Sequence, residues 1–334
     1  MAINLLNIQP HKVSRDLSGY ITFIYGPPKT GKTTLATQMP GALLLAFEKG
    51  YNALPGVMAQ DINTWGEMKQ VFRELKKPEV QAVYKTLVID TVDIAADLCQ
   101  KYVCQQLGIE NIGDGGWTNN GWAKYKKEFE EVFRGLTMMG YAVVFISHSK
   151  EATVKDQAGN EHTSIRPSIQ SSALAIIENM TDLYGYAHQI PTESGETEVV
   201  LTLRKPANVD IACGGRFKYI TPQIPFNYNS LSKALVDAID KEAKENNNQF
   251  VTEEREAVNT LKEYDFDALM AEFQELIGGL MTKDQNYYQP RITQIIEKYL
   301  GKGKKIAGVT RDQAELVYLI VDEIKAELIN NEKK

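Results

Sequence analysis

Apolar residues recur in short, nearly continuous runs through the first two thirds of the chain, and polar stretches separate them. The runs are rich in β-branched and aromatic residues, which predicts buried strands at 21–25, 43–47, 86–90, 142–147, 183–187, 199–204 and 217–220. Helical stretches lie between several of these runs. Apolar strands that alternate with helices are typical of a mainly parallel sheet covered on both faces. The last runs lie closer together, and the turn at 193–196 predicts an antiparallel extension of that sheet.

A different pattern begins near residue 265, where apolar residues follow only the helical period. Three sets of residues share a helical face, and the spacing of Thr310 and Gln313 predicts a capping box at the start of the last helix. The sets are Phe266, Leu269, Met270, Phe273, Ile277 and Leu280; Ile292, Ile295, Ile296 and Tyr299; and Leu316, Val317, Ile320, Ile324 and Leu328. We therefore predict a small three-helix module.

The domain boundaries follow from this change of pattern. Residues 241–275 hold four basic and ten acidic residues, a balance of 4 − 10 = −6, and the charge of the whole chain is also −6. The acidic stretch begins with an Asn-rich tract that lacks apolar periodicity, as a linker does. We predict a lead-in at 1–18, an α/β core at 19–239, an acidic linker at 240–264 and a helical module at 265–334.

The composition of the 334-residue chain is that of a globular protein, with 43% hydrophobic and 24% charged residues. Its longest apolar runs, 42–47 and 141–146, are too short to span a bilayer, and the N-terminus lacks the layout of a secretory signal. We therefore expect a cytoplasmic protein with no membrane partner. The three cysteines form no C-x-x-C pair, which argues against a zinc site or a disulfide framework. The net charge of −6 argues against a surface that coats DNA as a whole, although a local basic channel stays open.

The segment after the first predicted strand fits the phosphate-binding pattern G-x-x-x-x-G-K-[ST], and a short predicted helix follows it. The segment and the residue after it are Gly26, Pro27, Pro28, Lys29, Thr30, Gly31, Lys32, Thr33 and Thr34. Backbone amides of such a loop surround the phosphates, its lysine reaches the β and γ oxygens, and the next hydroxyl ligates Mg²⁺. We predict that this segment binds a nucleoside triphosphate, with Lys32 as a catalytic cation and Thr33 as a magnesium ligand. The alternative interpretation is a Gly-rich turn without a ligand.

Two acidic residues end predicted strands of the same sheet. Asp90 ends the strand 86–90, where P-loop proteins place a carboxylate that holds Mg²⁺, usually through water; capping of the next helix is the alternative. No acidic residue follows Asp90 directly, so the carboxylate that activates water must come from elsewhere. Glu48 ends the strand after the P-loop helix and is our candidate. A surface glutamate is the alternative, and Asp93 is the next candidate base.

The position of Glu48 resembles that of a glutamate in RecA-like recombinases and helicases, which orients and deprotonates the attacking water. The resemblance implies that a polar residue after the strand 142–147 senses the γ-phosphate, and His148 occupies that place. The family more often has glutamine there, and a helix-cap or loop histidine is the alternative. The chain has no N-K-x-D guanine motif, so we favour ATP over GTP.

The same resemblance assigns two DNA-binding loops to the irregular segments 109–121 and 150–168. Trp117 and Trp122, near the first segment, would stack on bases; packing in the core is the alternative. The cations of the second segment that would pair with phosphates are Lys150, Lys155 and Arg166.

Further cations follow the later strands, at the place where RecA-like filaments reach the ATP of the neighbouring subunit. Arg204 and Lys205 are the preferred pair for this catalytic role in a homo-oligomer, and Arg216 is the alternate. An ordinary solvated strand end is the other interpretation.

Together, the runs GPPKTGKT, ALLLAFEKGYNALPG and SHSKE resemble bacteriophage AAA-type ATPases of the RecA-like single-strand annealing group, over roughly residues 1–239. The resemblance implies a RecA-like P-loop fold with ATP and Mg²⁺ as cofactors. It also implies a homo-oligomer that anneals or recombines single-stranded DNA in the bacterial host cytoplasm, beside a phage single-strand-binding protein. A P-loop kinase for a small metabolite, with 150–168 as its lid, is one alternative. A nucleotide-gated scaffold with negligible ATPase activity is another.

Overall fold

The computed structural model describes the chain except residues 1–5, 7, 115, 117–119, 156–158, 160, 207–208, 246, 248–249, 254–263 and 331–334. It divides into two compact units, a core unit of Met1–Thr260 and a helical module of Leu261–Lys334. Among the described residues, no helix is long and apolar enough to cross a membrane.

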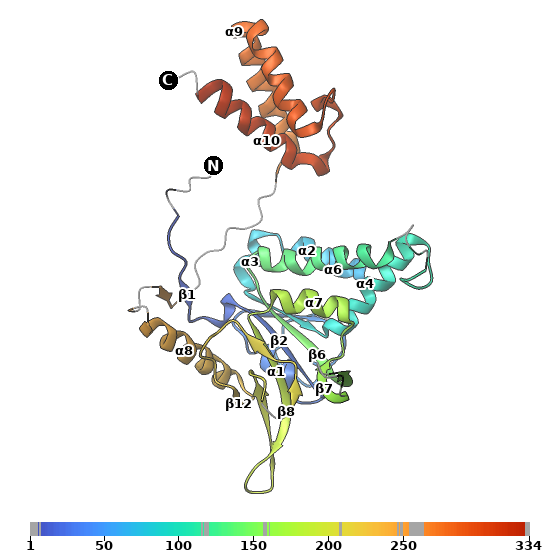
Figure 1. The fold of residues 1–334 in the computed structure, drawn as a ribbon, viewed down its shortest axis with the longest axis vertical. Coiled ribbons are helices and arrows are strands. Elements are labelled where there is room, and N and C mark those ends of the chain that lie inside the picture. The colour runs from blue at the N-terminus through green and yellow to red at the C-terminus, as the bar shows by residue number, and fades with distance from the viewer. Residues whose placement is uncertain are drawn as a thin grey trace. The chain divides into compact units, whose positions relative to one another are not determined.

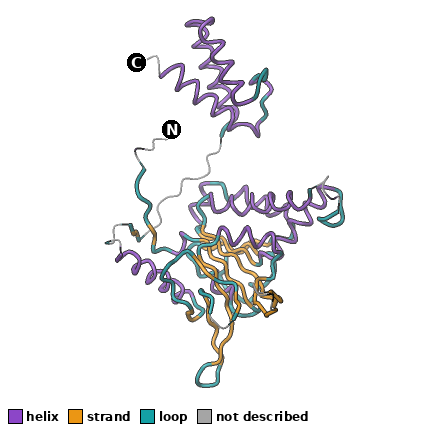
Figure 2. The backbone as a smooth tube through the Cα atoms, in the orientation of Figure 1, coloured by secondary structure: helices purple, strands orange, loops and turns teal. Residues whose placement is uncertain are grey.

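The core unit is built on one large sheet (Figure 2), and its strand pairing is mostly parallel, as predicted. From β8 across to β4 all neighbouring strands run parallel, while β9 and β12 extend the sheet in antiparallel fashion. In spatial order the strands are β12 (Gln223–Pro225), β9 (Thr197–Thr202), β8 (Leu183–Pro191), β2 (Ile21–Gly26), β6 (Ala142–Lys155), β5 (Thr86–Asp90), β3 (Ala42–Ala46) and β4 (Ala59–Asp61).

Helices cover both faces of this sheet (Figure 1). Along β6, Val143 and Phe145 face one apolar core while Val144 and Ile146 face the other, which is the period-two alternation of a strand buried on both sides. The first core is formed with α2 (Trp65–Glu74), α4 (Val92–Leu107), α6 (Gly121–Met138) and α7 (Ser171–Met180). The second is formed with α1 (Lys32–Ala36) and α8 (Tyr228–Glu245). The short helix α3 (Pro78–Val83) leads into β5.

The segment 150–168, expected to be irregular, is instead an antiparallel hairpin. After His148, β6 leaves the large sheet and pairs with β7 (Glu161–Pro167) from Ser149↔Pro167 to Lys155↔Glu161. The short strand β10 (Asp210–Ile211) pairs with the other edge of β7. The prediction was wrong because this segment has no continuous apolar run, and the hairpin is held by backbone pairing of half-exposed strands.

The predicted strand 217–220 is also wrong. Short strands flank it, β11 (Gly214–Gly215) and β12, but the residues themselves form a turn in which the Ile220 amide donates to the Phe217 carbonyl. Phe217 and Ile220 are both buried, so their apolar character reflects packing of a turn onto the core rather than a strand.

The core unit extends beyond both of its predicted ends. Near the N-terminus, β1 (Val13–Ser14) pairs in parallel with β13 (Val251–Thr252), and a 3₁₀ turn at Leu17–Gly19 follows. Arg15 forms an ion pair with Asp240 at 2.6 Å, and α8 continues to Glu245. Parts of the predicted lead-in and of the predicted linker therefore pack on the core, because contacts distant in sequence compensate for their polar composition.

The helical module has the three predicted helical segments. The helix α9 (Phe266–Leu300) is interrupted at Asp284, whose backbone is extended (φ −158°, ψ 93°) and whose carboxylate accepts from the Tyr287 amide at 3.0 Å. The third segment is α10 (Ala314–Ile324), continued by a π-helical turn, and the capping box of Thr310 and Gln313 is present before it. Apolar residues of all three segments share one core, including Phe273, Leu280, Ile292, Ile295, Val317, Ile320 and Ile324.

Candidate nucleotide-binding site

The P-loop follows β2 at the edge of the sheet where the parallel strands end. A Cβ atom on Gly26 would lie 2.1 Å from the carbonyl oxygen of Ala187 on β8, so only glycine fits where the loop begins. Gly31 has a φ of 86°, in the left-handed region that glycine adopts without cost. These two fixed positions of the motif therefore let the backbone turn sharply from β2 into α1.

Lys32 lies beneath the loop, with only 6% of its surface exposed. Its ammonium donates to the carbonyl oxygens of Gly26 at 3.0 Å and Pro27 at 2.7 Å. Burial lowers the pKa of Lys32, while the nearby carboxylates of Asp90 and Glu48 act in the opposite direction. The carbonyl oxygens of the P-loop therefore hold the Lys32 ammonium in a fixed position.

Thr33 and Asp90 form the pair that sequence reasoning assigned to a metal. The Thr33 hydroxyl donates to the Asp90 carboxylate at 2.6 Å, and Asp90 is 2% exposed. Burial raises the pKa of Asp90, against the hydrogen bond from Thr33, and the negative charge of Glu48 raises it further. A hydroxyl beside one buried carboxylate fits Mg²⁺, which takes oxygen ligands and usually binds through one or two carboxylates plus substrate phosphates. Among the described residues no cluster of three or more metal-binding side chains offers another such site.

Glu48 and His148 face each other beside this pair. The Phe47 and Glu48 amides donate to the Asp90 carbonyl at 2.7 and 3.2 Å, which fixes the end of β3 against the end of β5. The Glu48 carboxylate lies 3.6 Å from Nε2 of His148, a residue that pairs with Gly26 across β6 and β2.

One cavity of about 370 Å³ connects these groups. Its lining includes most of the P-loop together with Glu48, Asp90 and His148, brought from three different strand ends. The loop after β3 completes the lining with Gly50, Ala53 and Leu54, which sequence reasoning did not assign to the site. The signal available was the position of this Gly- and Pro-containing run directly after Glu48.

Asp93, the second candidate base, accepts hydrogen bonds that leave it little freedom. Its carboxylate accepts from the hydroxyls of Ser147 at 2.9 Å and Ser168 at 2.6 Å and from the His148 amide at 3.3 Å. Ser147 lies at the end of the part of β6 inside the sheet, one residue before its last pair with β2, and Ser168 follows β7. Asp93 therefore fastens the base of the hairpin next to His148, a role that spacing alone did not reveal.

The cations predicted to serve a neighbouring subunit are used within this chain. The Arg204 guanidinium donates to the carbonyls of Phe217 at 2.8 Å, Ile220 at 3.3 Å and Lys218. The other two bind carboxylates, Lys205 that of Asp210 at 2.5 Å and Arg216 that of Asp182 at 3.0 Å. The acceptors of Arg204 were missed because they lie in a turn that the sequence pattern had placed in the strand 217–220, and the two aspartates were missed because they are distant in sequence from that strand or carry no motif.

The predicted DNA-binding cations also have partners. Lys150 donates to the Ser168 carbonyl at 3.2 Å, Lys155 lies 3.4 Å from Glu161, and Arg166 lies 3.3 Å from Asp210. In the other segment Trp122 is 41% exposed, and Trp117 lies outside the described residues.

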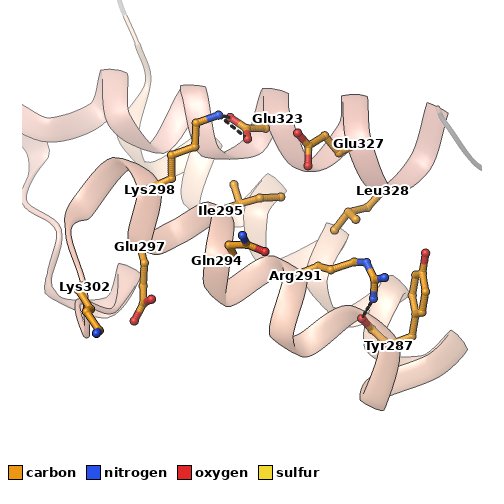
Figure 3. A pocket seen from close by; sticks show the side chains of 10 residues that line it. All are labelled: Tyr287, Arg291, Gln294, Ile295, Glu297, Lys298, Lys302, Glu323, Glu327 and Leu328. Atoms are coloured by element: carbon orange, nitrogen blue, oxygen red, sulfur yellow. Dashed lines mark hydrogen bonds and ion pairs between the residues drawn. The ribbon is translucent and has the colours of Figure 1, made fainter.

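A larger cavity, of about 810 Å³, lies within the helical module between the second part of α9 and α10 (Figure 3). Lys298 on one side binds Glu323 on the other at 2.7 Å, and the Arg291 guanidinium stacks 3.7 Å from the Tyr287 ring centroid. Lys298 is thus paired with a carboxylate, Arg291 is held by Tyr287, and carboxylates contribute as much of the lining as cations do. The cavity lacks a phosphate-binding loop, so its size does not make it the nucleotide site.

Comparison with known proteins agrees with this assignment. A family model described as an AAA domain matches residues 18–210, and the chain belongs to that family, an AAA-type class of P-loop nucleotide-binding ATPases. Over 329 residues the chain is 31% identical to the SPbeta prophage-derived uncharacterized protein YorG of Bacillus subtilis (strain 168), covering 97% of this chain and 98% of that protein. The similarity to a prophage protein thus includes the helical module as well as the ATPase core.

Proposed function

We propose that this protein is a RecA-like ATPase that hydrolyses MgATP and acts on single-stranded DNA in phage annealing or recombination. The observation that carries the ATPase part is the convergence of Lys32, Glu48 and the Thr33–Asp90 pair on one cavity. The strand order supports the RecA-like assignment, because β5 lies between β6 and β3 and so places Glu48 beside Asp90.

Each residue has a defined part in the proposed reaction. Lys32 pairs with β- and γ-phosphate oxygens, and Thr33 and Asp90 would hold a Mg²⁺ ion, which would supply positive charge to the phosphates. Glu48 accepts a proton from water as the water oxygen bonds to the γ-phosphorus and the bond to the β–γ bridging oxygen breaks. His148, beside Glu48, is placed to register whether the γ-phosphate is present.

The DNA part of the proposal rests on the sequence resemblance and on the hairpin of β6 and β7. Lys150, Lys155 and Arg166 lie on this hairpin, and DNA phosphates would compete with the partners that these side chains have in the free chain. The anchoring of both hairpin strands at Asp93 argues against a mobile substrate lid, as a small-molecule kinase would require. Assembly of several copies on the strand, beside a phage single-strand-binding protein, is part of the same proposal.

ATP hydrolysis measured with and without single-stranded DNA tests the proposal. We expect Mg²⁺-dependent turnover that the DNA stimulates, and DNA binding that weakens between about 50 and 200 mM salt as counterions are released. Lys32→Ala is the negative control, because it removes the cation that the loop places at the phosphates. Turnover that requires a small-molecule acceptor would identify a kinase instead, and ATP binding without turnover would identify a scaffold.

A further inference from the structure

A second lysine of the P-loop, Lys29, differs from Lys32 in exposure, backbone conformation and partners. Lys29 is exposed, lines the same cavity, and has a φ of 64° in the left-handed region. Among the described residues it makes no hydrogen bond or ion pair, whereas Lys32 is buried and donates to two loop carbonyls. A lysine in a backbone conformation that favours glycine, at the mouth of a ligand cavity, is the kind of strained residue that functional sites retain.

The cavity with a bound nucleotide would carry more negative than positive charge, which a further cation would reduce. The carboxylates of Glu48 and Asp90 line it, and Lys29 and Lys32 are the only lysines or arginines among its described lining residues. MgATP adds about two negative charges at neutral pH, so Lys32 alone leaves the occupied site strongly negative. The cations expected from elsewhere, Arg204 and Lys205, are bound by acceptors of their own chain and do not line the cavity.

We propose that the Lys29 ammonium binds the γ-phosphate of ATP in the same subunit, so that the site carries its own second cation. This inference rests on the proposed function in that it assumes ATP binding at the P-loop. The flexible four-carbon stem of lysine lets the ammonium swing from solvent onto a terminal phosphate without competing with a carboxylate partner. An added positive charge at the γ-phosphate stabilises the charge that develops there during transfer.

Nucleotide affinity separates a γ-phosphate contact from a structural role. In Lys29→Gln we expect the affinity for a non-hydrolysable ATP analogue to fall about tenfold, the value of one charge-assisted hydrogen bond, while ADP affinity stays within about twofold. Lys29→Arg should keep analogue affinity within about threefold of the unaltered protein. Lys49→Gln is the matched control, because Lys49 is exposed directly after Glu48 but does not line the cavity.

Lys29→Gly adds an independent measurement. It should lose analogue affinity as Lys29→Gln does, yet raise Tm by about 2 °C, because glycine adopts the left-handed backbone freely. Equal losses for the analogue and ADP, or an arginine variant as weak as the glutamine variant, would show that Lys29 shapes the loop instead. If the protein without any substitution binds neither the ATP analogue nor ADP, the proposed function itself is overturned.

Mixed assemblies decide whether the contact is made within one subunit. Lys29→Gln protein mixed with Lys32→Ala protein should turn over ATP no faster than its Lys29→Gln subunits do alone, since each subunit then lacks one of its own two cations. Recovery of turnover in the mixture would overturn the assignment and show that Lys29 serves a neighbouring subunit.

Discussion

The nucleotide edge of the sheet and the turns beyond β9 both carry charged residues after strand ends, but the two regions use them differently. At the nucleotide edge, Glu48 and His148 point at a shared cavity, and Lys29 has no partner among the described residues. Beyond β9, Arg204 is saturated by backbone carbonyls and Lys205 is bound by Asp210. The comparison teaches that a charged residue after a strand end serves a ligand where the fold places it on a cavity, whereas the same kind of residue stabilises a turn where acceptors of its own chain surround it.

The largest effect that would test this contrast is expected from Glu48→Gln. Glutamine keeps the shape and the contact with His148 but cannot take a proton, so turnover should fall about a hundredfold while ATP affinity changes little. Steady-state hydrolysis and nucleotide titration measure the two quantities. Glu79→Gln, on the exposed face of α3, serves as the control. A normal hydrolysis rate in Glu48→Gln would show that Glu48 is not the general base.

Asp93→Asn tests whether the nucleotide edge depends on the base of the hairpin. An amide in place of one carboxylate oxygen faces the donors of Ser147, Ser168 and His148, so His148 should lose its fixed position. We expect kcat to fall about tenfold with a KM for ATP within about threefold of normal. Ser168→Ala, which removes only one of the three bonds, should have a smaller effect. Equal kcat values for Asp93→Asn and the unaltered protein would limit Asp93 to holding the hairpin.

Arg204→Ala should show the smallest catalytic effect and a clear loss of stability. Three backbone carbonyls lose their charged donor, so we expect Tm to fall by about 4 °C while kcat of the folded protein stays within about twofold. Thermal unfolding and hydrolysis measured on the same preparation separate the two. A normal Tm with lost turnover would instead place Arg204 at the ATP of a neighbouring subunit.

The sequence predicted those parts of the molecule whose structure is set locally. The strand 86–90 and the P-loop were located correctly, because an apolar run or a fixed loop motif determines each within a few residues. The convergence of Glu48 on Asp90 also followed, since parallel strands end at the same edge of a sheet.

Structure set by distant contacts could not be predicted in this way. The pairing of Val13 with Val251 and the acceptors of Arg204 depend on segments far along the chain, and polar composition made those segments resemble a linker or a free strand end. The hairpin of β6 and β7 was missed for the same reason, because backbone pairing holds it without a continuous apolar run.

One continuous strand, β6, passes from the buried sheet at Ser147 into the hairpin that ends at Lys155. A nucleotide that shifts the part of this strand inside the sheet therefore changes the binding free energy of a ligand at the hairpin. Thermodynamic reciprocity then requires the hairpin ligand to change nucleotide affinity by the same factor. The coupling between the two sites can therefore be measured by titrating either ligand at fixed amounts of the other. Both titrations should yield the same interaction free energy.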